Sequence, residues 1–333
     1  MKFISIDGGA TKTIGVLYNE NFEILDIGLS GPSNFRTVGI GVFRRNIRDV
    51  VKKINEDVNE ITFALPGIKD SHGSMEKITD ELRSIFPGKR LKVYNDGEAG
   101  FHSRFPEGNG MVAAAGTGMV CYGKLRGNSV RASGWGWFLD DEGGAFYIGR
   151  RALEEVVRIV DGRGDFDSTL VDEIKRHYSL ESFSDLINIV YRGRIDVRSI
   201  SSIAILVSSN AIKGDLLSMK IMEESALATS RAIVSTYKKL SFPEDIGLSG
   251  YGGVFRSGAW YWEMVKDFVS KKIKIGKIKE PYFGYEAVIG SVVLKYSELG
   301  IDVKDNDLEK LRKGLNENLE RLDKKLRMKY LYF

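Results

Sequence analysis

The chain has 333 residues, of which 43% are hydrophobic and 28% charged, as in a globular protein and unlike a disordered one. Its 49 basic and 45 acidic side chains give a net charge of +4, too small to indicate a nucleic-acid partner, and no apolar run reaches the roughly 18 residues of a membrane span. A single cysteine, Cys121, excludes an internal disulfide, an iron–sulfur site and a cysteine-ligated zinc site.

The first third of the chain alternates predicted strands and helices. The expected elements are strands at 2–7, 13–18 and 23–29, a helix at 39–54, a strand at 61–65, a helix at 74–86 and a strand at 90–95. With a further helix after residue 95, the order is βββαβαβα. Because the first strand begins at residue 2, we expect no signal peptide and a cytoplasmic protein.

A second unit of the same kind begins near residue 110. Its expected elements are strands at 111–115, 119–124 and 128–133, a mostly helical stretch at 143–240, a strand at 245–249, and helices at 256–270 and 284–299 with a strand between them. Two such units in tandem predict a duplicated α/β fold with a cleft between its halves, in keeping with roughly 150 residues per domain. We place the domains at 1–109 and 110–304, the second with a helical insertion.

The remaining segment, 305–333, differs from both units. Leucines recur at spacings of three and four, with charged residues between them, at positions 308, 311, 315, 319, 322 and 326. This spacing predicts an amphipathic helix over 305–330. In one interpretation its leucine stripe packs on its own domain, and in the other it forms a helix–helix dimer contact.

The first of three glycine clusters lies between two predicted strands and begins with Asp7. Glycines let the backbone approach a ligand closely, and the backbone amides, hydroxyls and ammonium group gathered here are suited to bind a polyphosphate. The candidate phosphate-binding residues are Gly8, Gly9, Thr11, Lys12 and Thr13. Asp7, at the end of a strand, is suited to bind Mg²⁺ through water. A plain β-hairpin turn is the alternative.

The second cluster takes the equivalent place in the second unit and consists of Gly116, Thr117 and Gly118. Two glycine turns at matching positions of a duplicated fold would face each other across the cleft and bind phosphates from opposite sides. The third cluster spans 250–254 after the predicted strand at 245–249, and its candidate ligand-binding residues are Gly252, Gly253 and Val254. Small residues there allow an adenine and a ribose to lie against the backbone, although such a turn is often only a turn.

Asp96 follows directly after the predicted strand at 90–95. A carboxylate at this place is suited to accept the proton of a substrate hydroxyl as that hydroxyl attacks a phosphoryl group. The alternative is that the Asn95-Asp96-Gly97 sequence only caps the helix that follows.

The segment 134–144 combines aromatic residues, glycines and three consecutive acids. Sugar hydroxyls bind carboxylates, and the apolar faces of sugars bind flat aromatic surfaces, so this composition favours a sugar site. The candidate sugar-binding residues here are Gly134, Trp135 and Asp141. The alternative is that the acids at 140–142 favour the start of a helix.

As a set, these motifs resemble the superfamily of actin, sugar kinases and heat-shock ATPases. They resemble more closely the group of N-acetylglucosamine kinases and archaeal hexokinases within the BadF/BadG-type ATPase family. The motifs appear in the family's order over about residues 3–295. The matching segments are 7–13, 31–34, 95–96, 115–118, 134–137 with 141–143, 252–254 and 286–290.

The resemblance implies two ribonuclease H-like domains of the actin-like ATPase type, which close over ATP and a hexose in an interdomain cleft. It implies that the loops at 7–13 and 115–118 bind phosphate and that the third glycine cluster binds adenosine. Asp96 would take the proton of the sugar's 6-hydroxyl, and Asn34 and Asp141 would bind sugar hydroxyls. A homodimer is the usual expectation for the family.

The leading interpretation is a kinase that uses ATP and Mg²⁺ to phosphorylate a hexose or amino sugar, with N-acetylglucosamine or glucose as the expected substrate. The alternative is a nucleotide-dependent ATPase that activates a partner protein without an iron–sulfur cluster, because the cysteines used by such activators are absent. A sensor that has lost catalysis is a third interpretation, which Asp96 disfavours. The loop at 134–143 favours the kinase, since an ATPase switch has no use for tryptophans beside acids.

Overall fold

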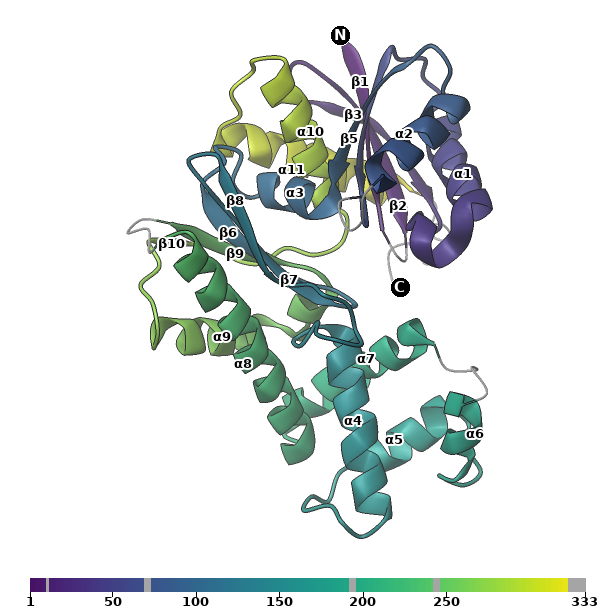
Figure 1. Ribbon diagram of the computed structural model, residues 1–333, viewed down its shortest axis with the longest axis vertical. Helices are drawn as coiled ribbons and strands as arrows, with labels where there is room; N and C mark the ends of the chain where they lie inside the picture. The colour runs from purple at the N-terminus through teal and green to yellow at the C-terminus, as the bar shows by residue number, and fades with distance from the viewer. Residues whose placement is uncertain (10–11, 69–72, 192–195, 242–245, 323–333) are drawn as a thin grey trace. The chain divides into compact units, whose positions relative to one another are not determined.

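The computed structural model describes residues 1–9, 12–68, 73–191, 196–241 and 246–322 (Figure 1). The chain divides into two compact units. Unit 1 contains Met1–Asn109 together with Gly284–Phe333, and unit 2 contains Gly110–Phe283.

Unit 1 is built on a five-stranded mixed sheet with the strand order β3-β2-β1-β4-β5. Its strands are β1 (Lys2–Gly8), β2 (Thr13–Asn19), β3 (Ile24–Ser30), β4 (Glu60–Leu65) and β5 (Arg90–Asn95). The first three form an antiparallel meander, whereas β4 and β5 run parallel to β1. The parallel strands β1, β4 and β5 therefore all end at the same edge of the sheet.

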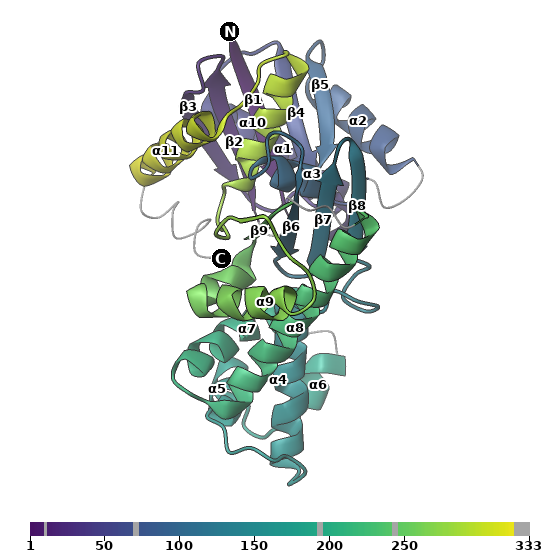
Figure 2. The ribbon, with the colours of Figure 1, turned by 90° about the vertical axis from the view of Figure 1, so that its left-hand side faces the viewer.

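Helices cover both faces of this sheet (Figure 1). They are α1 (Phe35–Ile54), α2 (Ser74–Ile85), α3 (Asp96–His102), α10 (Ala287–Glu298) and α11 (Asp305–Arg321). Because side chains alternate along a strand, Ile4 and Ile6 of β1 pack with α1 and α2 on one face, and Phe3 packs with α10 and α11 on the other. Figure 2 shows α10 and α11 in front of the strands.

Unit 2 repeats the same plan with the strand order β10-β9-β6-β7-β8. Its strands are β6 (Gly110–Ala115), β7 (Met119–Leu125), β8 (Asn128–Ser133), β9 (Gly247–Tyr251) and β10 (Lys277–Ile278). An antiparallel meander, β6-β7-β8, is again extended by strands parallel to its first member. The predicted duplication of a three-stranded opening is therefore confirmed.

The helices of unit 2 lie mostly between β8 and β9 in the chain. They are α4 (Ala145–Val160), α5 (Leu170–His177), α6 (Asp185–Tyr191), α7 (Val197–Ile212), α8 (Leu216–Lys239), the 3-10 helix η1 (Gly253–Ser257) and α9 (Ala259–Ser270). Among the described residues no single helix is long and apolar enough to cross a membrane. Only α7 and α8 taken together reach that length and apolarity, as a pair bent by 116°.

Three element boundaries differ from the sequence expectation. Helix α1 begins at Phe35 instead of residue 39, because Asn34 caps an extra turn that Gly39, with φ 73°, separates from the regular helix. Strand β9 extends to Tyr251 and therefore includes the first residues of the third glycine cluster. The expected helix at 256–270 is divided by Gly258, with φ 114°, into η1 and α9.

The end of the second domain also differs from the expected residue 304. The chain returns to unit 1 at Gly284, so α10 belongs to the first unit. The reason is packing, since Val288, Ile289 and Val292 of α10 are buried in one core with Ile14 of β2.

The C-terminal helix packs on its own unit, as the first interpretation of its leucine stripe expected. Leu308, Leu311 and Leu315 are buried in the core that α10 and β2 share. The observed helix ends at Arg321, and Leu326 lies outside the described residues.

Candidate active site

Two carboxylates lie at the edge of the unit 1 sheet where the parallel strands end. Asp7 is the penultimate residue of β1, and Asp96 is the first residue of α3, directly after β5. Helix capping is carried by Asn95, whose Oδ1 accepts a hydrogen bond from the Gly97 amide at 3.0 Å. The same amide donates to Asp96 Oδ1 at 2.8 Å, which fixes the orientation of the Asp96 carboxylate.

The pKa of Asp7 reflects this arrangement. Burial, and then repulsion from Asp96, raise the pKa of Asp7 from 3.8 to about 7, while the Lys12 ammonium opposes the shift. Lys12 is held with its Nζ 3.8 Å from the ring centroid of Tyr285, a residue of unit 1 just before α10. The fold therefore places two interacting carboxylates and one cation at this edge.

This donor set fits a hard divalent cation. Mg²⁺ prefers oxygen ligands and is usually bound by one or two carboxylates together with water and substrate phosphates. Among the described residues no group of three His, Cys, Asp or Glu side chains is arranged to hold a metal. An ion next to Asp7 would thus take its remaining ligands from water and phosphate.

The first glycine cluster forms a tight turn against the segment 31–34. The Gly9 amide donates to Lys12 O at 2.8 Å, and Gly9 O accepts from the amides of Ser33 at 3.0 Å and Asn34 at 3.2 Å. A Cβ on Gly8 would lie 2.3 Å from Ser33 Oγ, so only glycine allows this approach. The two motifs, separate in sequence, form one structural unit at the end of β1.

Thr13 and Asn34 use their side chains inside this unit. Thr13 is fully buried, and its hydroxyl donates to Gly31 O at 2.7 Å, with Ser33 Oγ at 2.8 Å. A hydroxyl has a single hydrogen, so the expected contribution of the Thr13 hydroxyl to a phosphate cradle is corrected. Asn34 Oδ1 accepts from the Arg36 amide at 3.1 Å and caps α1. Thr11, the other expected hydroxyl, lies outside the described residues.

The second glycine cluster, 116–118, belongs to unit 2 and packs on the first turn of α4. The amides of Ala145 and Phe146 donate to Gly116 O at 2.8 Å and Thr117 O at 2.9 Å. The first amides of a helix lack partners within the helix, and here the loop carbonyls supply them. The loop and the start of α4 are thereby fixed to each other.

The three motifs of unit 2 that the sequence singled out converge on this loop. A Cβ on Gly118 would lie 2.1 Å from Asp141 Oδ2, and a Cβ on Gly144 would lie 2.8 Å from Thr117 O. Gly252, with φ 114°, approaches so closely that its Cβ would lie 2.4 Å from Ala115 O. The structure therefore brings the second phosphate candidate, the acidic loop and the third glycine cluster together within unit 2.

The two aspartates of the acidic loop differ in their contacts. Asp140 accepts hydrogen bonds from the Ser133 hydroxyl at 3.0 Å and from the Trp135 amide at 3.3 Å, and so holds the loop together. Asp141 has φ 61°, and its carboxylate accepts only the Gly136 amide, at 3.1 Å, among the described residues. Burial, and then the neighbouring Asp140, raise the pKa of Asp141, while the Gly136 amide lowers it.

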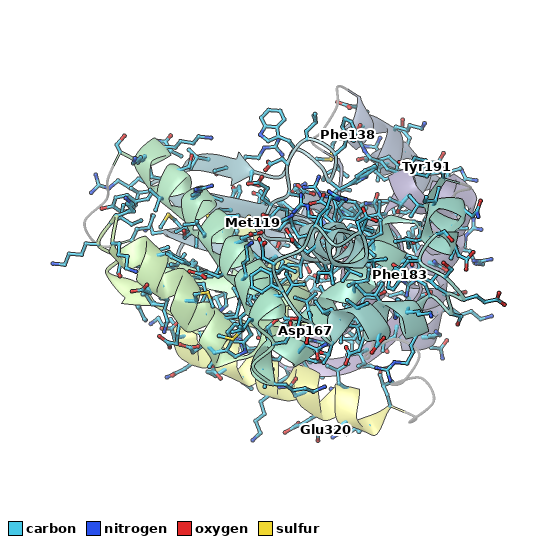
Figure 3. The ribbon with its side chains drawn as sticks, turned by 90° about the horizontal axis from the view of Figure 1, so that it is seen from below. Met119, Phe138, Asp167, Phe183, Tyr191 and Glu320 are labelled. Carbon is cyan, nitrogen blue, oxygen red and sulfur yellow. The ribbon has the colours of Figure 1, made fainter. Side chains whose placement is uncertain are left out.

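The aromatic side chains of the same loop are exposed. Trp135 is 68% exposed, and Phe138, labelled in Figure 3, is 80% exposed. The Arg131 guanidinium lies 5.2 Å from the Trp135 ring centroid. Contiguous exposed apolar surface of this kind marks ligand or partner contact more often than packing. Gly134, with φ 81°, serves the turn itself, since its Cβ would lie 2.9 Å from Val120.

Val254 and Gly253 of the third cluster offer different surfaces. The Val254 side chain is buried in the core of unit 2, so this residue can contact a ligand only through its backbone. A Cβ on Gly253 would meet nothing within 4 Å, so the space beside this residue is open.

Sequence reasoning missed three residues that support the unit 1 edge. Ser33 contacts both Gly8 and Thr13. The Tyr285 ring lies against the Lys12 ammonium. Gly290 allows α10 to cross α3 closely, since a Cβ there would lie 1.6 Å from Ala99 O. In the sequence, only their position indicates a role, because each lies in or next to a short motif that was singled out for other residues.

The two mixed sheets, each a three-stranded meander extended by parallel strands, define the α/β fold of actin-like ATPases. The chain belongs to the BadF/BadG/BcrA/BcrD ATPase family, whose model matches residues 4–294. The resemblance seen in the sequence motifs is thereby confirmed.

Characterised relatives of this chain are sugar kinases. An N-acetylmuramic acid/N-acetylglucosamine kinase of Clostridium acetobutylicum is 28% identical over 310 residues, covering 90% of this chain and 99% of that protein. An N-acetyl-D-glucosamine kinase of Dictyostelium discoideum is 27% identical over 296 residues, covering 81% of this chain and 89% of that protein.

Solved structures share the fold. The crystal structure of a Porphyromonas gingivalis protein proposed to be an N-acetylglucosamine kinase superimposes with a TM-score of 0.70 at 16% identity, covering 90% of this chain and 100% of that one.

Proposed function

We propose that this protein is a kinase that transfers the γ-phosphoryl group of ATP to the 6-hydroxyl of a hexose or amino sugar, with N-acetylglucosamine or glucose as the substrate. The observation that carries the proposal is the carboxylate pair at the edge of the unit 1 sheet, in which burial, and then repulsion from Asp96, raise the pKa of Asp7. The activities of the relatives support the substrate class.

Asp96 is the catalytic base in this proposal. Phosphoryl transfer needs little covalent chemistry from the protein, so one oriented carboxylate next to the attacking hydroxyl is sufficient. The hydrogen bond from the Gly97 amide orients the carboxylate to accept the proton of the 6-hydroxyl. Capping by Asn95 frees Asp96 from that structural task.

Asp7 binds Mg²⁺ through water in this proposal. The ion, when bound with ATP, supplies positive charge that neutralises the phosphate oxygens. Because burial, and then repulsion from Asp96, raise the pKa of Asp7 to about 7, a cation held next to Asp7 would favour the ionised form of this carboxylate.

The phosphates of ATP bind two glycine loops. In unit 1 the loop contributes backbone amides and the Lys12 ammonium, and Thr13 contributes by fixing the loop to the segment 31–33. The proposed ATP-binding residues are Gly8, Gly9, Thr11, Lys12, Gly116, Thr117, Gly118, Gly252, Gly253 and Val254. The last three contact adenosine through backbone, which agrees with the open space beside Gly253.

The sugar binds Asn34 and Asp141 through its hydroxyls and Gly134 and Trp135 through its apolar face. Because Asn34 Oδ1 caps α1, the amide Nδ2 is the group that we assign to the sugar. The exposed Trp135 ring supports the assignment, since a flat apolar face is available for stacking.

The test is release of ADP from Mg²⁺-ATP with a panel of N-acetylglucosamine, glucose, glucosamine and N-acetylmannosamine, against a control without sugar. The proposal predicts ADP release that depends on one or more sugars, and phosphorus–proton correlation NMR of the product then shows phosphate on the 6-oxygen. ADP release at the same rate with and without every sugar contradicts the proposal and favours an ATPase that acts on a partner protein.

A further inference from the structure

The short helix α3 joins the proposed base to a buried contact at its other end. The helix has seven residues and so a length of about 10 Å, with Asp96 at its start and Ser103 as its C-cap. Its second half is buried, and Gly290 of α10 crosses it without a Cβ because that atom would lie 1.6 Å from Ala99 O. A rigid segment this short transmits a shift at one end to the other.

Arg312 of α11 binds the C-terminal end of α3. Its Nη2 donates to Ser103 O at 2.9 Å, and its Nε lies 3.5 Å from Glu286 Oε2, in the N-cap residue of α10. The carbonyls at the end of a helix lack partners within the helix and carry partial negative charge, so a guanidinium is favoured there. The Arg312 side chain is only 15% exposed; its Nη2 makes the hydrogen bond to α3, whereas its Nε makes none among the described residues.

The position of Arg312 is itself fixed by packing. Its neighbours Leu308, Leu311 and Leu315 are buried in the core of unit 1, and Asn318 donates to Ile24 O at 3.2 Å. Helix α11 lies beyond residues 4–294, to which the family model applies. Helix α11, which follows the matched residues, therefore holds the helix that begins with the proposed base.

We propose that Arg312 is a positioning residue for Asp96, acting through α3. The inference rests on the proposed role of Asp96 as the base. Arg312 fixes the C-terminal end of α3 to α10 and α11, and this holds the Asp96 carboxylate where the 6-hydroxyl reacts. Removal of the guanidinium lets α3 shift and slows proton transfer without removing any group that binds ATP or sugar.

The kinetic test compares Arg312→Met with Lys313→Met, a matched change at an exposed residue of the same helix. Because misplacement of a reacting group by about 1 Å slows catalysis strongly, Arg312→Met lowers kcat by roughly 10-fold, with the KM values for ATP and sugar changed less than about twofold. Arg312→Lys restores part of kcat, and Lys313→Met changes nothing. A loss of kcat that follows a loss of folded protein, or an equal effect of Lys313→Met, overturns the proposal.

A double-variant test asks whether Arg312 acts through Asp96. In the Asp96→Asn background the base is absent, so adding Arg312→Met leaves the residual turnover unchanged. A further loss of similar size to that in the wild type overturns the proposal and assigns Arg312 a general structural role. If Asp96→Asn itself keeps full turnover, the assignment of the base fails, and the positioning role fails with it.

Hydrogen exchange separates these two failures. Arg312→Met speeds exchange of the backbone amides of α3 and leaves those of α1 unchanged, whereas Lys313→Met leaves both unchanged. Unchanged exchange in α3 overturns the inference about Arg312 alone and leaves the proposed kinase activity standing.

Discussion

Ionised Asp7 lowers the stability of the folded protein at the place where the proposed site needs a carboxylate. Its pKa, raised from 3.8 to about 7 by burial and by Asp96, means that the folded state favours the protonated form. The contribution of protonated Asp7 to the free energy of unfolding is therefore fully present below about pH 4 and is lost as the pH rises through 7. At pH 8 Asp7 is ionised in both states, but only in the folded protein does its burial make the ionised form costly in free energy.

The substitution Asp7→Asn removes this penalty. Without Mg²⁺, the free energy of unfolding of the variant exceeds that of the wild type by about 1–4 kcal/mol at pH 8, and the difference disappears at pH 4. Urea denaturation at the two pH values measures this difference. A gain of the same size at both values, or none at pH 8, contradicts the burial of an interacting carboxylate at Asp7. Turnover is lost in the variant although its stability rises.

At the scale of elements, the β6–β7 turn offers a way to separate folding from binding. Gly116 and Gly118 stand in the same loop, but a Cβ on Gly116 meets nothing within 4 Å, whereas one on Gly118 would lie 2.1 Å from Asp141. A loss of function in Gly116→Ala thus reports on the ligand, and a loss in Gly118→Ala reports on the fold as well.

We expect Gly118→Ala to lower the free energy of unfolding by about 1–3 kcal/mol and Gly116→Ala to change it by less than about 0.5 kcal/mol. Gly116→Ala nevertheless raises the Kd for ATP, because the added methyl group stands where the phosphates bind. Thermal unfolding and ATP titration calorimetry measure the two quantities. Unaltered ATP affinity in Gly116→Ala would remove this loop from the phosphate site.

At the scale of the whole molecule, the C-terminal helix belongs to the core of unit 1. The leucines in the first part of the stripe, Leu308, Leu311 and Leu315, are buried there, together with Asn318. A homodimer, which the family resemblance implies, therefore requires a surface other than these three leucines.

Leu311→Asp tests this assignment of the stripe. Leu311 is fully buried, so a charge at that position lowers the free energy of unfolding by more than about 3 kcal/mol, while Lys313→Asp on the exposed side changes it little. Denaturation and light scattering measure stability and mass together. A stable Leu311→Asp protein of lower mass than the wild type would instead assign the stripe to a dimer.

The order of elements and the glycine motifs were predictable because hydrophobic period and turn residues are local features. The end of the second domain was not, since the return of α10 to unit 1 depends on packing against Ile14, far away in the sequence. Residue types alone placed Thr13 in a phosphate cradle, but its donor is used by Gly31. The hydrogen bond from Arg312 to the Ser103 carbonyl was not predictable either, because a charged residue on a helix does not indicate which distant carbonyl it binds.

The most direct test of the central proposal is the turnover of Asp96→Asn with ATP and the best sugar. The amide cannot accept the proton of the attacking hydroxyl, so kcat falls by about 10²- to 10⁴-fold while the Kd for ATP stays within about twofold of the wild type. Asp49→Asn, at an exposed position on α1, is the matched control and keeps full turnover. Undiminished turnover by a folded Asp96→Asn protein contradicts the assignment of the base and, with it, the proposed mechanism.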